Sequence, residues 1–69
     1  MIRMELYLKL EEKGMTQQKV SELTGIRQPS ISDYCNNNFR RISRENLNNL
    51  CKIFNCDVSD IIKYIPNNK

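Results

Sequence analysis

The sequence predicts an all-α fold, a compact domain of five helices, and three observations support this class. Apolar residues recur at spacings of three and four through most of the chain, as on one face of a helix. Ser and Thr stand where helices would begin, and Gly or Asn where they would end. A chain of 69 residues has room for a single domain. We place this domain at residues 1–66, followed by a frayed tail at 67–69.

The first helix is expected over residues 2–13, where Ile2, Leu6 and Leu10 recur every four residues and form one apolar stripe. The alternation of leucines at positions 6, 8 and 10 also fits a strand. The flanking Glu and Lys residues are good helix formers, so they favour the helix. The remaining apolar residues of this segment, which widen the stripe and are expected to pack in the core, are Met4 and Leu8.

The second helix is expected to follow Gly14, because glycine commonly stands just past the last turn of a helix. Thr16 is a good N-cap for it. Val20 and Leu23 should face inward from this helix. Gly25 then ends it, since glycine adopts a left-handed conformation at little cost.

The third helix is expected at residues 28–35, where Ile31, Tyr34 and Cys35 share one inward face. Pro29 falls in its first turn. Proline is tolerated there because the missing N–H would have no partner within the helix.

A loop at residues 36–41 separates this helix from the fourth, because consecutive asparagines favour turns. Ser43 should cap the fourth helix, with Ile42 and Leu47 as a hydrophobic staple. Asn55 should end it. The apolar stripe expected to be buried along this helix consists of Leu47, Leu50, Cys51 and Phe54.

A short fifth helix is expected to begin after Ser59 as its N-cap. Ile61, Ile62 and Ile65 would point inward from it. Pro66 would stop it, because proline cannot continue a helix.

Composition excludes several classes of protein. The chain has no histidine and only two glycines, so it lacks Cys-His and Ser-His nucleophile pairs and any phosphate-cradling glycine loop. The carboxylates fit helical i,i+4 charge pairs better than an acid–base pair. We therefore expect neither an enzyme nor a cofactor. The three cysteines, which show no metal-site spacing, are Cys35, Cys51 and Cys56. Cys35 and Cys51 fall at apolar-periodic positions, so buried reduced thiols are expected.

The charge distribution points to an anionic partner. The net charge is +3, and four of the five arginines lie between residues 27 and 44, where Asp33 is the one acid. The N-terminus has no apolar signal-peptide core, and no apolar run reaches membrane-spanning length. We expect a cytoplasmic protein without a membrane or small-molecule partner.

The segment from Thr16 to Cys35 reads as two short helices hinged at Gly25. The positions that carry a family resemblance run through the whole chain: Gly14-Met15-Thr16-Gln17, Val20, Ser21, Gly25-Ile26, Ser30-Ile31-Ser32, Ile42-Ser43, Leu47, Leu50-Cys51, Phe54-Asn55-Cys56 and Asp60-Ile61-Ile62. In these positions the chain resembles the Cro/repressor-type (xenobiotic-response-element) helix-turn-helix domains. It is most similar to the short single-domain members of bacteria, phages and mobile elements. The resemblance implies a lambda-repressor-like five-helix fold.

The chain departs from that family at three positions. Ser21 stands where alanine is usual, and its similar size should preserve close helix packing. Arg27 stands where a capping Ser or Thr is usual, and it cannot cap the third helix. Pro29 occupies a slot where a polar base reader often sits, so readout there is reduced to van der Waals contact.

The resemblance places the third helix in the major groove of DNA. Gln28 is the leading base reader, because an amide can donate to and accept from adenine at once. Asp33 has two interpretations: it accepts from cytosine N4, or it pairs with Arg27 or Arg40 and orients them. The expected base contacts are Gln28, Pro29, Ser32 and Asp33. The expected phosphate contacts are Gln17, Arg27, Ser30, Asn36, Asn37, Asn38, Arg40 and Arg41.

These features predict a sequence-specific double-stranded DNA-binding transcriptional regulator, a repressor that binds a palindromic operator as a homodimer. One domain of this size offers too little interface for tight specific binding alone. The expected dimer surface is the region of the fourth and fifth helices or the C-terminal end. The alternatives are an antitoxin or accessory subunit that acts with a protein partner, and an interaction module that has lost DNA binding.

Overall fold

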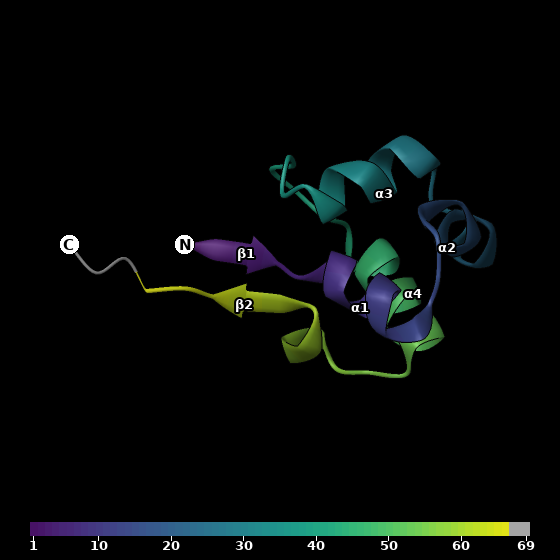
Figure 1. Ribbon diagram of the computed structural model, residues 1–69. Coiled ribbons are helices and arrows are strands. Elements are labelled where there is room, and N and C mark those ends of the chain that lie inside the picture. The colour runs from purple at the N-terminus through teal and green to yellow at the C-terminus, as the bar shows by residue number, and fades with distance from the viewer. Residues whose placement is uncertain (67–69) are drawn as a thin grey trace.

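The computed structural model describes residues 1–66, so the expected tail at 67–69 lies outside the described residues. Four α-helices form a body, from which a ribbon of two short strands projects (Figure 1). In chain order the elements are β1 (Ile2–Met4), α1 (Leu6–Lys13), α2 (Gln17–Thr24), α3 (Gln28–Cys35), α4 (Arg44–Phe54), the 3-10 helix η1 (Val58–Asp60) and β2 (Ile62–Tyr64).

The structure is mostly helical, but the expected all-α class with five helices is wrong at both ends. Residues 2–4 form a strand, and the first helix begins only at Leu6. β1 and β2 pair antiparallel, with Ile2 opposite Tyr64. The Glu5 N–H donates to the Ile61 carbonyl at 2.6 Å and extends this pairing. The apolar residues of each strand alternate with a cation, and that period favours a strand once a partner is available.

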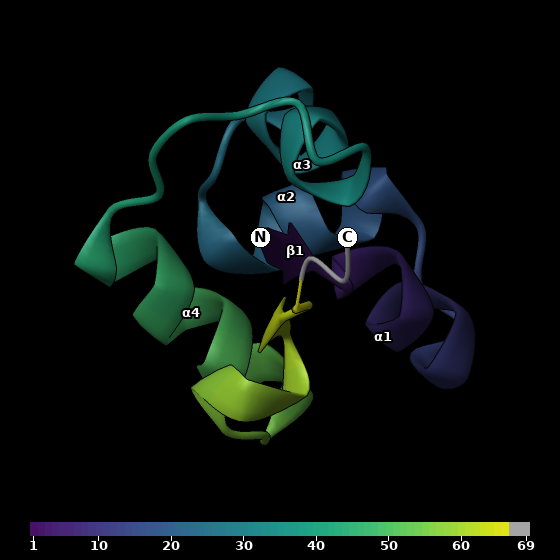
Figure 2. The same ribbon diagram turned by 90° about the vertical axis from the view of Figure 1, so that its left-hand side faces the viewer.

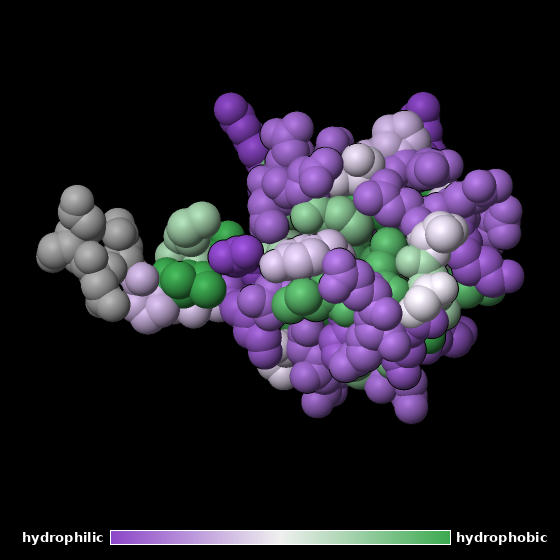
Figure 3. All heavy atoms as spheres, in the orientation of Figure 1, coloured by the Kyte–Doolittle hydropathy of each residue, from purple (hydrophilic) through white to green (hydrophobic). Residues whose placement is uncertain are grey.

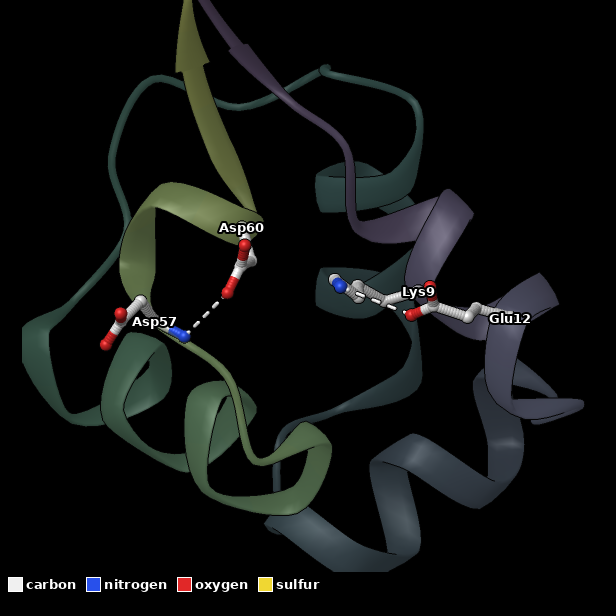
Figure 4. Close-up of polar contacts among 4 residues, drawn as sticks. All are labelled: Lys9, Glu12, Asp57 and Asp60. Atoms are coloured by element: carbon white, nitrogen blue, oxygen red, sulfur yellow. Dashed lines mark hydrogen bonds and ion pairs between the residues drawn. The ribbon is translucent and has the colours of Figure 1, made fainter.

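The expected fifth helix is also wrong. Ser59 is not an N-cap: a single 3-10 turn follows Asp57, whose N–H donates to the Asp60 carboxylate at 3.0 Å (Figure 4). Ile61 is fully buried as expected, but Ile62 is only partly buried and Ile65 is exposed. Pairing with β1 draws residues 62–64 into an extended chain, so the helix cannot continue.

The local helix signals are confirmed. The Oγ1 of Thr16 and the Oγ of Ser43 each accept a hydrogen bond from the backbone N–H three residues on, at 3.1 and 3.0 Å. Gly14 and Gly25 adopt left-handed conformations after their helices, and Asn55 does the same after α4. The expected bounds of the third helix agree with α3. Short-range chemistry therefore sets the starts and ends of the helices.

The core lies between the helices and the inner end of the ribbon (Figure 2). Its fully buried members, which come from β1, all four helices and their connections, include Met4, Leu6, Val20, Ile31, Leu50 and Ile61. Three residues expected inside are instead exposed by 43–64 %: Ile2, Leu8 and Leu23. Leu47 and Cys51 are only partly buried. The apolar stripes of α1 and α2 are thus narrower than the sequence pattern suggested.

Asn37 ties the two halves of the chain together. Its side-chain Oδ1 accepts from the Met4 N–H at 2.6 Å, and its Nδ2 donates to the Met4 carbonyl at 2.9 Å. Asn37 also has a positive φ of 57°, a conformation that asparagine tolerates better than most residues. This side chain therefore holds β1 against the loop after α3, a role that its asparagine-rich context did not suggest.

We predict that Asn37→Ala lowers the free energy of unfolding by about 1–3 kcal/mol, because it removes both hydrogen bonds to Met4 and strains the backbone. Urea denaturation followed by circular dichroism measures the loss. Asn38→Ala is the matched control. Its side chain bonds no other described residue, so a change within about 0.5 kcal/mol is expected. Asn37→Gly relieves the backbone strain but adds an entropy cost of about 0.5–1 kcal/mol, so a loss beyond that amount belongs to the hydrogen bonds. An Asn37→Ala variant as stable as Asn38→Ala would contradict the tie.

Candidate nucleic-acid interface

The turn between α2 and α3 is held by polar groups of α2 itself. Gly25 has a φ of 79° and sends the chain away from the helix. The Ser21 hydroxyl donates to the Ile26 carbonyl, and the Thr24 hydroxyl accepts from the Ile26 N–H at 3.1 Å while it donates to the Val20 carbonyl at 2.7 Å. The angle between the two helices is therefore fixed by short-range bonds. Size alone explained Ser21 in the sequence, and this use of its hydroxyl was missed.

The buried face of α3 decides which of its residues point outward. Ile31 is fully buried, and Tyr34 and Cys35 are buried beside it as the sequence predicted. The Tyr34 hydroxyl accepts a hydrogen bond from the Asn46 side chain of α4 at 3.0 Å. These contacts hold α3 against the core in one rotation about its axis.

The outward face of α3 carries the residues expected to read bases. Gln28, Pro29 and Asp33 are exposed, and Ser32 is partly buried. Gln28, Pro29 and Ser32 line an open hollow together with Gln17, the first residue of α2. We call these four residues the reading patch. The structure thus brings one expected phosphate contact beside three expected base contacts, at the N-terminal ends of both helices.

Arg27 begins α3 without capping it. Its backbone is extended, with φ −63° and ψ 142°, and its side chain makes no capping hydrogen bond. The Ser30 N–H turns back to the Arg27 carbonyl at 3.0 Å, and Ser30 is partly buried. Arg27 directly precedes the reading patch in the sequence, and its guanidinium is exposed, so it is free to bind an anion.

The loop at residues 36–41, here called the arginine loop, forms a second group. Arg40 and Arg41 are exposed and border a different hollow from that of the reading patch. Phe39 anchors the loop: its ring meets the Tyr34 ring edge-on, with centroids 5.1 Å apart. The expected phosphate contacts therefore divide between the N-terminal ends of the helices and this anchored loop.

The three asparagines of the arginine loop differ in what their side chains do. The Asn36 amide donates to the Ser32 hydroxyl at 3.4 Å, and the Asn38 side chain is exposed. The Asn37 amide is committed to Met4. Asn37 therefore supports the loop from behind, whereas Asn36 and Asn38 remain available on its surface.

Asp33 forms no ion pair with Arg27 or Arg40. Within residues 1–66 the ion pair is Lys9–Glu12, at 3.2 Å on the surface of α1 (Figure 4). The hydrogen bond that the Lys9 ammonium donates to the Glu12 carboxylate raises the pKa of Lys9. The interpretation that Asp33 orients a neighbouring arginine therefore has no support in the structure, and its carboxylate stands free on the outward face of α3.

Comparison with known proteins identifies the family. The model of the Cro/C1-type helix-turn-helix DNA-binding domain matches residues 6–67. The chain belongs to this family. Among solved structures, it is similar to a Bacteroides fragilis protein described as a candidate DNA-binding protein. Their TM-score is 0.80 at 25 % sequence identity, over 91 % of this chain and 100 % of that one. A search of curated proteins finds no match.

The remaining chemistry of this Cro/C1-type domain is sparse. Its three cysteines are free thiols. Burial raises the pKa of the Cys35 thiol, and burial together with the neighbouring Cys51 raises that of Cys56. Across residues 1–66 no cluster of His, Cys, Asp or Glu could hold a metal ion. No described helix is both long and apolar enough to cross a membrane.

We predict that Arg27→Ser stabilises the Cro/C1-type domain by about 0.5–1 kcal/mol, because it adds an N-cap acceptor and removes a cation from the N-terminus of a helix. Pro29 has no N–H, so the serine hydroxyl would share the Ser30 N–H, which already donates to the carbonyl of residue 27 at 3.0 Å. Urea denaturation measures the gain. Arg40→Ser removes the same charge from the arginine loop and is expected to change stability by less than about 0.5 kcal/mol. Equal effects of the two substitutions would show that the start of α3 is not under-capped.

Proposed function

We propose that this chain is a sequence-specific transcriptional regulator of double-stranded DNA, a repressor that binds a palindromic operator as a dimer. The observation that carries the proposal is the reading patch, an open surface at the start of α2 and along the first half of α3 in a Cro/C1-type DNA-binding domain. In helix-turn-helix domains the second helix of the motif, here α3, is the recognition helix, and its N-terminal residues contact base edges. The surface has both the position and the chemistry for direct readout.

Base readout falls to the outward residues of α3. Gln28 presents an amide that can bond adenine at two atoms, and Asp33 presents a free carboxylate that can accept from cytosine N4. Pro29 offers an apolar surface to a thymine methyl group. Ser32, partly buried and four residues after Gln28, faces the same side of the helix and completes the contact.

Phosphate contacts position the domain on both sides of the groove. Gln17 stands at the N-terminus of α2, where the helix dipole favours an anion. The other proposed phosphate contacts, which lie at the start of α3 and on the arginine loop, are Arg27, Ser30, Asn36, Asn38, Arg40 and Arg41. We give Asn37 a supporting role, because its amide already bonds Met4.

Dimerisation follows from the small size of the reading patch. One domain reads few base pairs, so two copies on two half-sites are needed for tight specific binding. A two-fold dimer requires a palindromic site with half-sites roughly 34–36 Å apart. A bound dimer of this kind blocks access to the DNA it covers, which supports a repressor.

We predict that Gln28→Ala relaxes base preference at one position per half-site, with a loss of about 1–3 kcal/mol of discrimination there. Selection of bound sequences from random duplex DNA measures this change. Arg41→Ala should weaken binding to all sequences alike and leave the selected sequence unchanged. If the wild-type protein enriches no sequence at modest salt, specific regulation is ruled out and an interaction module remains.

The salt dependence of DNA affinity distinguishes a specific phosphate contact from the effect of the overall charge of the protein. The wild-type affinity should fall steeply with added salt, and Arg41→Ala should reduce the slope of log affinity against log salt by about 1. Lys52→Ala is the matched control, because it removes one positive charge from an exposed residue of α4 that borders neither hollow. The same reduction of the slope in both variants would mean that the effect comes from the overall charge of the protein and not from a phosphate contact of Arg41.

A further inference from the structure

The ribbon of β1 and β2 has one apolar face and one cationic face. Residues opposite each other in an antiparallel pair share a face, and successive residues alternate. The register sets Ile2 opposite Tyr64 and Met4 opposite Ile62, so these four share one face. Arg3 and Lys63 lie on the other. Within Ile2–Met4 and Ile62–Tyr64 the ribbon is therefore amphipathic. Met1 and Ile65, which bond each other just beyond these strands, add apolar side chains at the outer end of the second face.

The apolar face continues from the core out into solvent. At the inner end Met4 is fully buried and Ile62 packs against the core. At the outer end Ile2 is 64 % exposed and Tyr64 is 67 % exposed. Figure 3 shows that hydrophobic residues lie on the part of the molecule that projects beyond the polar body. A β-branched and an aromatic side chain side by side on a strand pair are typical of a packed face.

A hollow of about 260 Å³ lies between the ribbon and the arginine loop, and Ile2 is one of its lining residues. Its apolar lining is Ile2, Ile62, Phe39 and Ile42, and its polar lining is Asn37, Arg40 and Arg41. A projecting apolar pair and an apolar recess thus adjoin on the same surface. A two-fold contact between identical chains requires this self-complementarity, since each copy must offer both the projection and the recess.

We infer that a second copy of this chain docks on the apolar face of the ribbon, with Ile2 and Tyr64 of each copy packed toward the hollow of the other. The inference rests on the proposed function for its two-fold symmetry and for its use on DNA. No charged side chain lies on the apolar face of the ribbon, and the like charges that the contact brings together are those of Arg40 and Arg41 at the edge of the hollow. Exposed contiguous apolar surface of this kind marks interaction sites on small soluble domains.

The position of the ribbon suits a dimer on DNA. The molecule measures 40 Å along its longest axis and about half that across, and the ribbon projects from one side of the body, below the loop that follows α3 (Figure 1). Two copies joined through their ribbons would hold their bodies, each with its α3, on opposite sides of the symmetry axis. The arginine loops, which border the docking hollow, would then lie near that axis. Their mutual repulsion weakens the free dimer, and DNA phosphates would offset it.

The hollow between α4 and η1 is the competing surface. It is lined by Leu47, Cys51 and Val58 but also by Arg44 and Asp57, which carry opposite charges. Val58 is the strongly exposed apolar residue there, at 48 %. Val58 projects alone beside this hollow, whereas the ribbon offers the exposed pair Ile2 and Tyr64, so the ribbon is favoured.

The test substitutes both exposed residues, Ile2→Thr with Tyr64→Thr. Threonine favours strands and leaves the charge unchanged, so the ribbon and the electrostatic attraction to DNA should survive. Val58→Thr is the matched control at the competing hollow. Leu8→Gln is a control at an apolar residue that is 43 % exposed on α1. Circular dichroism confirms the folding of each variant, and Tyr64→Thr alone replaces the double variant if the latter unfolds.

Sedimentation equilibrium and DNA titration then give separate readouts. Free wild-type protein should dimerise as concentration rises, and the double variant should remain monomeric. On a selected duplex with two half-sites, wild type should bind cooperatively. The double variant should lose about 10-fold or more of that cooperativity and keep its affinity for a single half-site.

Several results would overturn the ribbon interface. They are independent filling of two half-sites by a monomeric wild-type protein, unchanged dimerisation of the double variant, or loss of the dimer in Val58→Thr. A wild-type protein that binds no DNA but dimerises through Ile2 and Tyr64 would refute the proposed function and leave the interface standing.

Discussion

The structure depends on the burial of one face of α3. Ile31 is fully buried, and full burial of such a side chain contributes about 1.5–3 kcal/mol, a large share of the stability of a small domain. A rotation of α3 would expose Ile31 and Tyr34 and break the Tyr34 bond to Asn46. The outward positions of Gln28 and Asp33 are therefore fixed by packing on the opposite side of the same helix. The core therefore holds the outward residues of α3 in place before DNA binds.

The sequence predicts the helix-turn-helix well because its signals are short-range. Thr16, Gly25 and Ser43 act within a few residues of themselves, and the spacing of Ile31, Tyr34 and Cys35 identifies the buried face of α3. The sequence predicts a helix at the start of the chain because the spacing of Ile2, Leu6 and Leu10 fits one, and a helix at its end because Ser59 is a good N-cap. The strand at Ile2 exists through its pairing with Tyr64, a residue at the far end of the chain. No window of sequence contains both partners.

The same limit applies to the candidate site. Elimination of the buried face gave the outward residues of α3, but their gathering with Gln17 into one hollow depends on the angle between α2 and α3. Asn37 shows the limit most clearly. Its neighbours Asn36 and Asn38 have the same side chain, and only the nearness of Met4 commits the Asn37 amide to a backbone partner within the protein. Contacts of the named residues with DNA remain predictions.

The arginine loop connects the two surfaces that we propose. Phe39 anchors it to α3 through Tyr34, and Asn37 anchors it to β1 through Met4. Because the loop is ordered by these internal contacts, Arg40 and Arg41 need less ordering when they meet phosphate, and less of the binding energy is lost to entropy. The same residues border the hollow beside the ribbon. A partner chain in that hollow would therefore press on the loop that meets DNA, which gives dimerisation and DNA binding a shared physical element through which each can favour the other.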